Sequence, residues 1–163
     1  RYNEEKMAIL EQDLLVARQA WGEGLIAVSK KYESEGIESA RLLASKMLDD
    51  LYGFNLGPVL FKPTLSGGMN TFRTDKSGAL SYFVGHNSQY PQDSGFGIKF
   101  WREVSSETSA IFIDGTTAMW MGWVSFKDKN GDLTKVDKSW GYKMDPNGIL
   151  KIVLHHSSLP YQG

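Results

Sequence analysis

The sequence predicts an α+β domain in which N-terminal helices pack on a curved, mostly antiparallel sheet to form a cone. Three observations support this fold class. Apolar residues in the first third of the chain recur every three or four positions, which is typical of amphipathic helices. From about residue 98 onward the period changes to two, as in strands. The dipeptides Asp114-Gly115, Asn130-Gly131 and Asn147-Gly148 are strong hairpin signals between those strands.

The first third divides into two predicted helices. The apolar stripe of the first helix consists of Met7, Leu10, Leu14, Ala17, Trp21, Leu25 and Val28. Ser34 and Gly36 predict a break, because glycine readily ends a helix. The stripe of the second helix consists of Ile37, Ala40, Leu43, Met47 and Leu51, and this helix is expected to end near Gly53. Both stripes are expected to face the core.

A less regular segment connects these helices to the sheet. Val59–Phe61 is predicted to be a short strand, and Gly67-Gly68 is predicted to form a turn. Asp75 is expected to begin a short third helix that carries Tyr82 near its end. The polar composition of residues 86–97 indicates a surface loop.

The remainder of the chain is predicted to form strands. Their ranges are Ile98–Val104, Ser109–Ile113, Thr117–Phe126, Leu133–Met144 and Ile149–Ser157. A sheet of this length has to curl, and the helices have to cover its concave face, so a cavity is expected between the two layers. The strand around Trp120 and Trp123 is apolar on both faces, which predicts a homodimer interface on the outside of the sheet.

Length and composition restrict the class of protein. The 163 residues fit a single domain, 1–163, that can bury its own core. A net charge of -1 indicates neither a nucleic-acid nor an anionic-membrane partner. No apolar run approaches the ~20 residues of a membrane helix. The absence of cysteine excludes disulfides, thiolate catalysis and zinc–thiolate sites. Because the chain begins at Arg1, we expect a preceding segment, with any targeting signal, to have been removed.

A histidine- and serine-rich run closes the last predicted strand. It reads His155-His156-Ser157-Ser158-Leu159-Pro160, and two further stretches accompany it, Phe61-Lys62-Pro63-Thr64 and Ala79-Leu80-Ser81-Tyr82-Phe83. Together they resemble the iota-class carbonic anhydrases over essentially the whole chain. That class belongs to the NTF2-like superfamily, with the SnoaL-like proteins and the calcium/calmodulin-dependent kinase association domain. The resemblance implies an NTF2-like cone and a homodimeric enzyme that reversibly hydrates carbon dioxide to bicarbonate. It also implies carbon concentration, in an algal plastid or a cyanobacterial or bacterial cytoplasm or periplasm.

The resemblance also implies which side chains line the pocket. The residues implied for catalysis are Thr64, Tyr82, His155 and Ser157, and the three hydroxyls among them are implied to bind the substrate. Because the motif is doubled, His156 and Ser158 form an equally good pair; the interval from Tyr82 favours the first pair but leaves the register open. Strand alternation lets one pair face the interior while the other faces away.

The number of histidines bears on metal binding. A catalytic zinc needs about three protein ligands, and the chain has three histidines, of which the adjacent His155 and His156 diverge. A mixed site of His86, one strand histidine and a carboxylate keeps zinc or manganese as the alternative. The count therefore favours an enzyme with no metal and no other cofactor.

Without a metal, positioning and a base have to replace the metal-bound hydroxide. We expect the three hydroxyls to hold bicarbonate and the attacking water, and His155 to accept or relay the proton. Tyr82 is expected to position first and act as a base second, since a phenol has a pKa of ~10. The apolar wall for carbon dioxide is expected from Phe61, Leu65, Phe83 and some of Trp101, Trp120 and Trp123.

Two other functions fit the same fold class. A non-catalytic association domain would have an apolar pocket without converging hydroxyls. A SnoaL-like or ketosteroid-isomerase-like enzyme would need a carboxylate base in the cavity, and Glu103 is the nearest candidate. Fold alone does not separate these functions.

Overall fold

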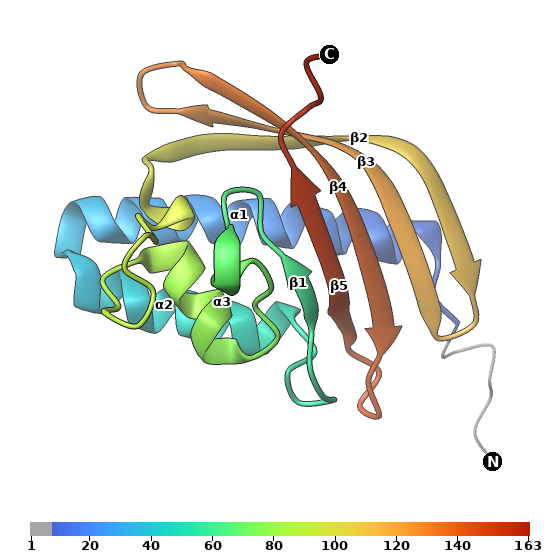
Figure 1. The fold of residues 1–163 in the computed structure, drawn as a ribbon. Coiled ribbons are helices and arrows are strands. Elements are labelled where there is room, and N and C mark those ends of the chain that lie inside the picture. The colour runs from blue at the N-terminus through green and yellow to red at the C-terminus, as the bar shows by residue number, and fades with distance from the viewer. Residues whose placement is uncertain (1–7) are drawn as a thin grey trace.

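The computed structural model of the chain describes residues 8–163, so Met7 of the first predicted stripe lies outside the described residues. Its helices are α1 (Glu11–Glu35), α2 (Ile37–Leu51) and α3 (Lys76–Val84), with the short 3₁₀ helices η2 (Gly68–Asn70) and η3 (Phe96–Ile98). Its strands are β1 (Leu60–Lys62), β2 (Trp101–Asp114), β3 (Thr117–Asp128), β4 (Leu133–Met144) and β5 (Leu150–Ser158). The strands arch over the helices, which lie along the concave face (Figure 1). The predicted α+β cone is confirmed.

The five strands form one mixed sheet in the order β1-β5-β4-β3-β2. Strands β2 to β5 make an antiparallel meander, whereas β1 runs parallel to β5, with Phe61 beside His155. The parallel strand arrives from the helical layer, so it brings the segment after Lys62 next to the end of β5. Residues separated by more than 90 positions therefore meet at one edge of the cone.

The prediction of two strands over Ile98–Val104 and Ser109–Ile113 is wrong, because residues 101–104 and 109–113 belong to the continuous strand β2, while Ile98 ends η3. Its polar middle lies at the sheet edge, where exposed polar side chains do not interrupt a strand. A bulge between Thr108 and Ala110 bends it instead. On the neighbouring strand, a Cβ at Gly122 would lie 2.1 Å from the carbonyl oxygen of Glu107, so only glycine permits this close approach.

Gly36 separates the two long helices, as predicted. Its φ of 89° lies in the left-handed region that glycine adopts at little cost. The buried face of α1 consists of Leu14, Arg18, Trp21, Gly22, Leu25, Val28 and Ser29. Leu10 is exposed because it precedes the first turn, where its N–H donates to the Asp13 carboxylate at 2.8 Å. Its predicted place in the buried stripe is therefore wrong, and the burial of Arg18 is unexpected.

Helix α3 and the loop that follows it are held in place by polar contacts. Asp75 begins the helix, and its carboxylate accepts a hydrogen bond from the Gly78 N–H at 2.8 Å. The buried Arg73 and Asp93 form a bidentate ion pair with both N···O distances at 2.8 Å, and the Ser81 hydroxyl donates to the same carboxylate at 2.6 Å. These contacts tie the loop to α3 and so fix the position of Tyr82.

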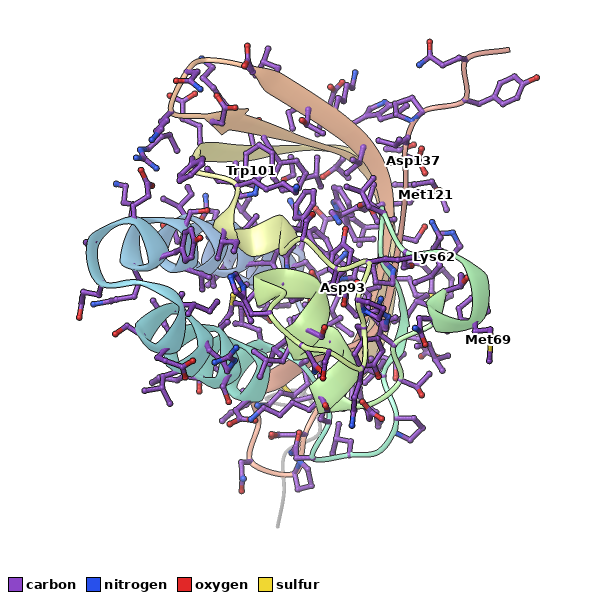
Figure 2. All side chains as sticks on the ribbon, turned by 60° about the vertical axis from the view of Figure 1, so that its left-hand side comes forward. Lys62, Met69, Asp93, Trp101, Met121 and Asp137 are labelled. Atoms are coloured by element: carbon purple, nitrogen blue, oxygen red, sulfur yellow. The ribbon has the colours of Figure 1, made fainter. Side chains whose placement is uncertain are left out.

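Side chains fill the space between helices and sheet (Figure 2). The largest fully buried aromatic side chains are Trp21, Trp120, Trp140, Tyr52, Tyr142, Phe61 and Phe126. The cavity predicted between the layers is thus reduced to smaller spaces, among them one of about 260 Å³ beside Arg18 and one of about 20 Å³ beside Tyr82. Within residues 8–163, no helix has the length and apolar composition needed to cross a membrane.

Candidate active site

Strand β5 presents one His-x-Ser pair to the interior. His155 is 1% exposed and Ser157 is fully buried, whereas His156 points to solvent. Ser158 is half-buried on the same side as His156 and donates to Asp137 at 3.1 Å. The register left open by the sequence is therefore settled for His155 and Ser157 as the inward pair.

The hydroxyls of Thr64 and Ser157 lie 2.5 Å apart. The parallel pairing of β1 with β5 produces this contact, because Lys62 lies beside His156 and Thr64 follows two residues later. Lys62 also donates to the Ser157 carbonyl oxygen at 2.8 Å, which fixes the strand end. In such a pair one hydroxyl donates to the other, so the accepting residue keeps its own hydrogen for a third group. The pair can therefore donate to one oxygen of a bound ligand.

Tyr82 joins this pair from α3. Its phenol oxygen accepts the Leu65 N–H at 3.2 Å, directly after Thr64 in the chain. Burial raises the pKa of Tyr82 to about 12, although hydrogen bonding to Leu65 and Thr64 acts in the opposite direction. The phenol is therefore protonated at neutral pH, and its hydrogen is available for donation. The adjoining space of about 20 Å³ lies between Leu65, Tyr82 and Phe96 and is of the size that holds a single water.

His155 does not contact this hydroxyl cluster through a free ring nitrogen. Its Nδ1 lies 2.8 Å from the Tyr52 hydroxyl and its Nε2 lies 2.8 Å from Lys138 Nζ. Its ring stacks on Phe61 at 4.5 Å. Burial and the charge of Lys138 lower the pKa of His155 well below its ordinary value. Direct proton abstraction by His155, as predicted from sequence, does not fit this geometry.

The hydrogen bonds around His155 also define its protonation. The Trp21 indole donates to the Tyr52 oxygen at 2.9 Å, so the Tyr52 hydrogen is available for His155 Nδ1. Nε2 then carries the remaining ring hydrogen and donates to the lone pair of Lys138. An ammonium group has no lone pair, so this arrangement requires an uncharged amine. In this tautomer, which gives the Tyr52 hydrogen an acceptor, Lys138 and His155 are both neutral; in the other tautomer a Lys138 ammonium donates to Nε2.

Lys138 is the site residue that sequence reasoning missed. It is 4% exposed, it pairs with Ser157 across β4 and β5, and its Nζ lies 5.0 Å from the Trp21 ring centre. Burial lowers its pKa to about 7, Lys62 acts in the same direction, and Asp137 opposes both. The available signal was the alternation of β4, where Lys138 falls between the inward positions Val136 and Trp140.

The predicted apolar wall is only partly correct. Phe61, Phe83, Trp101 and Trp120 are buried in the core. Leu65 is exposed at the rim, and Trp123 lies on the outer face of the sheet because it alternates with Trp120. Phe96 takes their place, stacking on Tyr82 at 5.8 Å.

The residues proposed for a mixed metal site are not brought together. His86 is exposed on the loop after α3, with its Nδ1 bonded to the Val84 carbonyl oxygen at 2.9 Å. In the part of the chain that the structure describes, no three histidine or carboxylate side chains are arranged to hold a metal ion. Glu103 is also unsuited as an interior base, because it is exposed and pairs with Lys127 at 3.3 Å.

Comparison with known proteins identifies the family of this chain. Residues 12–159 match the family described as metal-independent carbonic anhydrase. A protein of that name from Nostoc sp. (strain PCC 7120) is 51% identical over 155 residues, which is 95% of this chain and 76% of the relative. The crystal structure of a cyanobacterial iota-carbonic anhydrase complexed with bicarbonate is 50% identical, covers 96% of both chains and superposes with a TM-score of 0.95.

A more distant structure supports the fold alone. A putative dehydratase of the NTF2-like family from Streptomyces avermitilis is 11% identical, with a TM-score of 0.56 over 92% of this chain and 95% of its own. The fold is thus NTF2-like, and the specific likeness extends over nearly the whole length. The chain belongs to the metal-independent, iota-class carbonic anhydrases.

Proposed function

We propose that this chain reversibly hydrates carbon dioxide at the hydroxyl cluster of Thr64, Tyr82 and Ser157, without a metal. The observation that carries the proposal is the 2.5 Å pair of Thr64 and Ser157, with a protonated Tyr82 beside it at the edge of a small space. Bicarbonate, the product, was bound in the cyanobacterial structure that is 50% identical to this chain. An association domain needs no such cluster.

In the hydration direction the water oxygen bonds to the carbon of carbon dioxide. One C=O electron pair moves to its oxygen, where a hydroxyl donor stabilises the developing charge. A water proton leaves, so the products are bicarbonate and one proton. Phe96 and Phe61 provide apolar contacts beside Tyr82, where an uncharged linear molecule is better solvated than an ion.

We assign the proton-accepting function to the neutral Lys138 amine, with His155 as the residue that orients it. Lys138 lies opposite Ser157 on the neighbouring strand, and its Nζ lies 2.8 Å from His155 Nε2. To take the water proton, the amine has to turn its one lone pair from His155 towards the hydroxyl cluster. A base with a pKa near 7 is suited to accept a proton at neutral pH and release it again to solvent.

The test is stopped-flow carbon dioxide hydration after dialysis against a chelator. The wild-type activity is expected to survive the chelator. Thr64→Ala, Tyr82→Phe and Ser157→Ala are each expected to lower kcat/KM by about 10²- to 10³-fold, the usual cost of removing one oxyanion donor. Ser158→Ala is the matched control, because it removes the same hydroxyl from the outward side of the strand. Loss of activity on chelation, with recovery on zinc or manganese addition, would reject the metal-free mechanism.

We also propose that the protein is a homodimer that associates through the outer face of its sheet. Phe112, Met119, Met121 and Trp123 are exposed neighbours on β2 and β3, and Met121 projects away from the helices (Figure 2). Met121→Lys is expected to halve the mass measured by light scattering at micromolar concentration, because it places a charge within this patch. Leu42→Lys, on the exposed side of α2, is the control. A wild-type monomer, or an unchanged Met121→Lys dimer, would contradict this interface.

A further inference from the structure

Three buried polar atoms have no hydrogen-bond partner among the described residues. They are Arg18 Nη1, Trp140 Nε1 and the Tyr142 hydroxyl. Guanidinium and indole nitrogens are donors only, and a phenol also donates. Buried polar groups are rarely left unpaired, so each of them calls for a partner beyond the described residues.

The three atoms belong to one region, between α1 and strands β2 to β4. Arg18 and Trp140 both line the cavity of about 260 Å³. The Arg18 guanidinium lies 4.9 Å from the Trp120 ring, and Trp120 pairs with Trp140 across β3 and β4. Tyr142 follows Trp140 by two residues and so faces the same interior, although it is not one of the residues that line the cavity. The charge of Arg18 acts on the pKa of the Tyr142 phenol, against the effect of burial.

Among residues 8–163, Arg18 has no carboxylate partner. Its Nε donates to the Ser106 hydroxyl at 3.2 Å, and none of the ion pairs within residues 8–163 includes it. Burial lowers the pKa of Arg18, but a guanidinium group stays charged in proteins. A buried cation without an anion is unfavourable, so the binding of an anion in this cavity is electrostatically favourable.

We propose that Arg18, Trp140 and Tyr142 form a second anion site, separate from the Thr64–Ser157 cluster, that binds one small oxyanion such as bicarbonate or a short carboxylate. The planar guanidinium group binds two oxygens of such an ion side by side. The indole and the phenol then donate to the remaining lone pairs of the ion's oxygens. A single cation within a cavity of about 260 Å³ matches a small monovalent oxyanion rather than a polyphosphate. Leu15 and Gln19, at the cavity wall, are partly exposed and leave a route from solvent.

This site shares a wall with the catalytic centre. Trp21 and Trp140 line the cavity, and their rings lie 5.8 Å and 5.3 Å from the His155 ring. No residue of the hydroxyl cluster lines the cavity. An anion bound at Arg18 therefore does not compete for Thr64 or Ser157, and the two sites can be occupied together.

The test follows the indole N–H resonances of the ¹⁵N-labelled protein during titration with sodium acetate, sodium bicarbonate and sodium chloride. The Ser157→Ala background removes a donor from the hydroxyl cluster, so that binding is measured without activity. A saturable shift of the Trp140 indole resonance is expected with acetate and bicarbonate. Arg18→Met is expected to weaken this binding by at least about tenfold, and Tyr142→Phe by several-fold. Arg41→Met, at an exposed helix position, is the control and is expected to leave it unchanged.

Two results would overturn the proposal. The first is a Trp140 resonance that does not shift in a saturable way, which would mean that water alone fills the cavity. The second is equal binding by Arg18→Met or, if that variant does not fold, by Tyr142→Phe. Chloride binding as tight as acetate binding would reject the oxyanion assignment. Because hydration activity is not the readout, failure here is distinguishable from failure of the proposed catalytic function.

Discussion

Two polar centres lie inside the cone and share the rings of Trp21 and Trp140 as a common wall. Around His155 every ring nitrogen, the Tyr52 hydroxyl and the Trp21 indole are hydrogen-bonded at 2.8–2.9 Å. Around Arg18 one guanidinium nitrogen, the Trp140 indole and the Tyr142 hydroxyl have no partner within residues 8–163. Both centres are buried to a similar degree, so burial alone does not explain the difference.

The difference concerns what each centre has to do. A complete network of hydrogen bonds holds the side chains in one orientation, which suits a base that acts on every turnover. An incomplete network of donors is stabilised only when an acceptor arrives, which suits a ligand site. Lys138 and Arg18 thus show two ways to bury a basic side chain: the amine gives up its proton, whereas the guanidinium keeps its charge.

The largest expected effect is on activity, from Lys138→Met. This substitution keeps the side-chain volume but removes the base, and we expect kcat/KM for hydration to fall by about 10²-fold. The wild-type kcat/KM should rise with pH through an apparent pKa of about 7, and the variant should lose this rise. Lys138→Arg should not restore it, since arginine stays protonated. An unchanged pH profile in Lys138→Met would assign the base to another group.

Lys138 also predicts how stability depends on pH. Burial lowers its pKa to about 7 in the folded state, whereas an unfolded chain has a lysine pKa of ~10.4. Between these values the unfolded chain binds more protons, so stability from this group is lost as pH falls from ~10 to 7. The free energy of unfolding should therefore rise with pH by up to about 1.4 kcal/mol per unit. Urea titrations across this range should show a flatter dependence for Lys138→Met. Lys135→Met, exposed on the same strand, should keep the wild-type slope.

The sequence predicts the fold well because periodicity is a local property. The break at Gly36, the start of α3 at Asp75 and the bounds of β4 all follow from neighbouring residues. The continuity of β2 does not, since its polar middle resembles a turn and only its pairing with β3 shows otherwise. The outward position of Trp123 likewise depends on the register of the sheet.

The candidate site is predictable only where a motif marks it. Thr64, Tyr82 and Ser157 belong to recognisable stretches, and the structure brings them together. Tyr52 and Lys138 do not, because they reach His155 from positions 103 and 17 residues away in the chain. Lysine is also almost never fully buried, so a sequence pattern offers little reason to place it inside.

The smallest expected effects come from two matched tyrosine substitutions that compare the centres directly. Tyr52→Phe removes the only described partner of the Trp21 indole and leaves His155 Nδ1 without a donor, so it should cost about 1–3 kcal/mol of unfolding free energy. Tyr142→Phe removes a hydroxyl that has no partner, and in the absence of added oxyanion it should change stability by less than about 0.5 kcal/mol or increase it. Saturating acetate should then stabilise the wild type more than Tyr142→Phe, because only the wild type has all three donors. The measurement is urea unfolding. An equal loss of unfolding free energy in both variants would mean that the Tyr142 hydroxyl is hydrogen-bonded as fully as the Tyr52 hydroxyl, and that the Arg18 cavity does not bind a ligand.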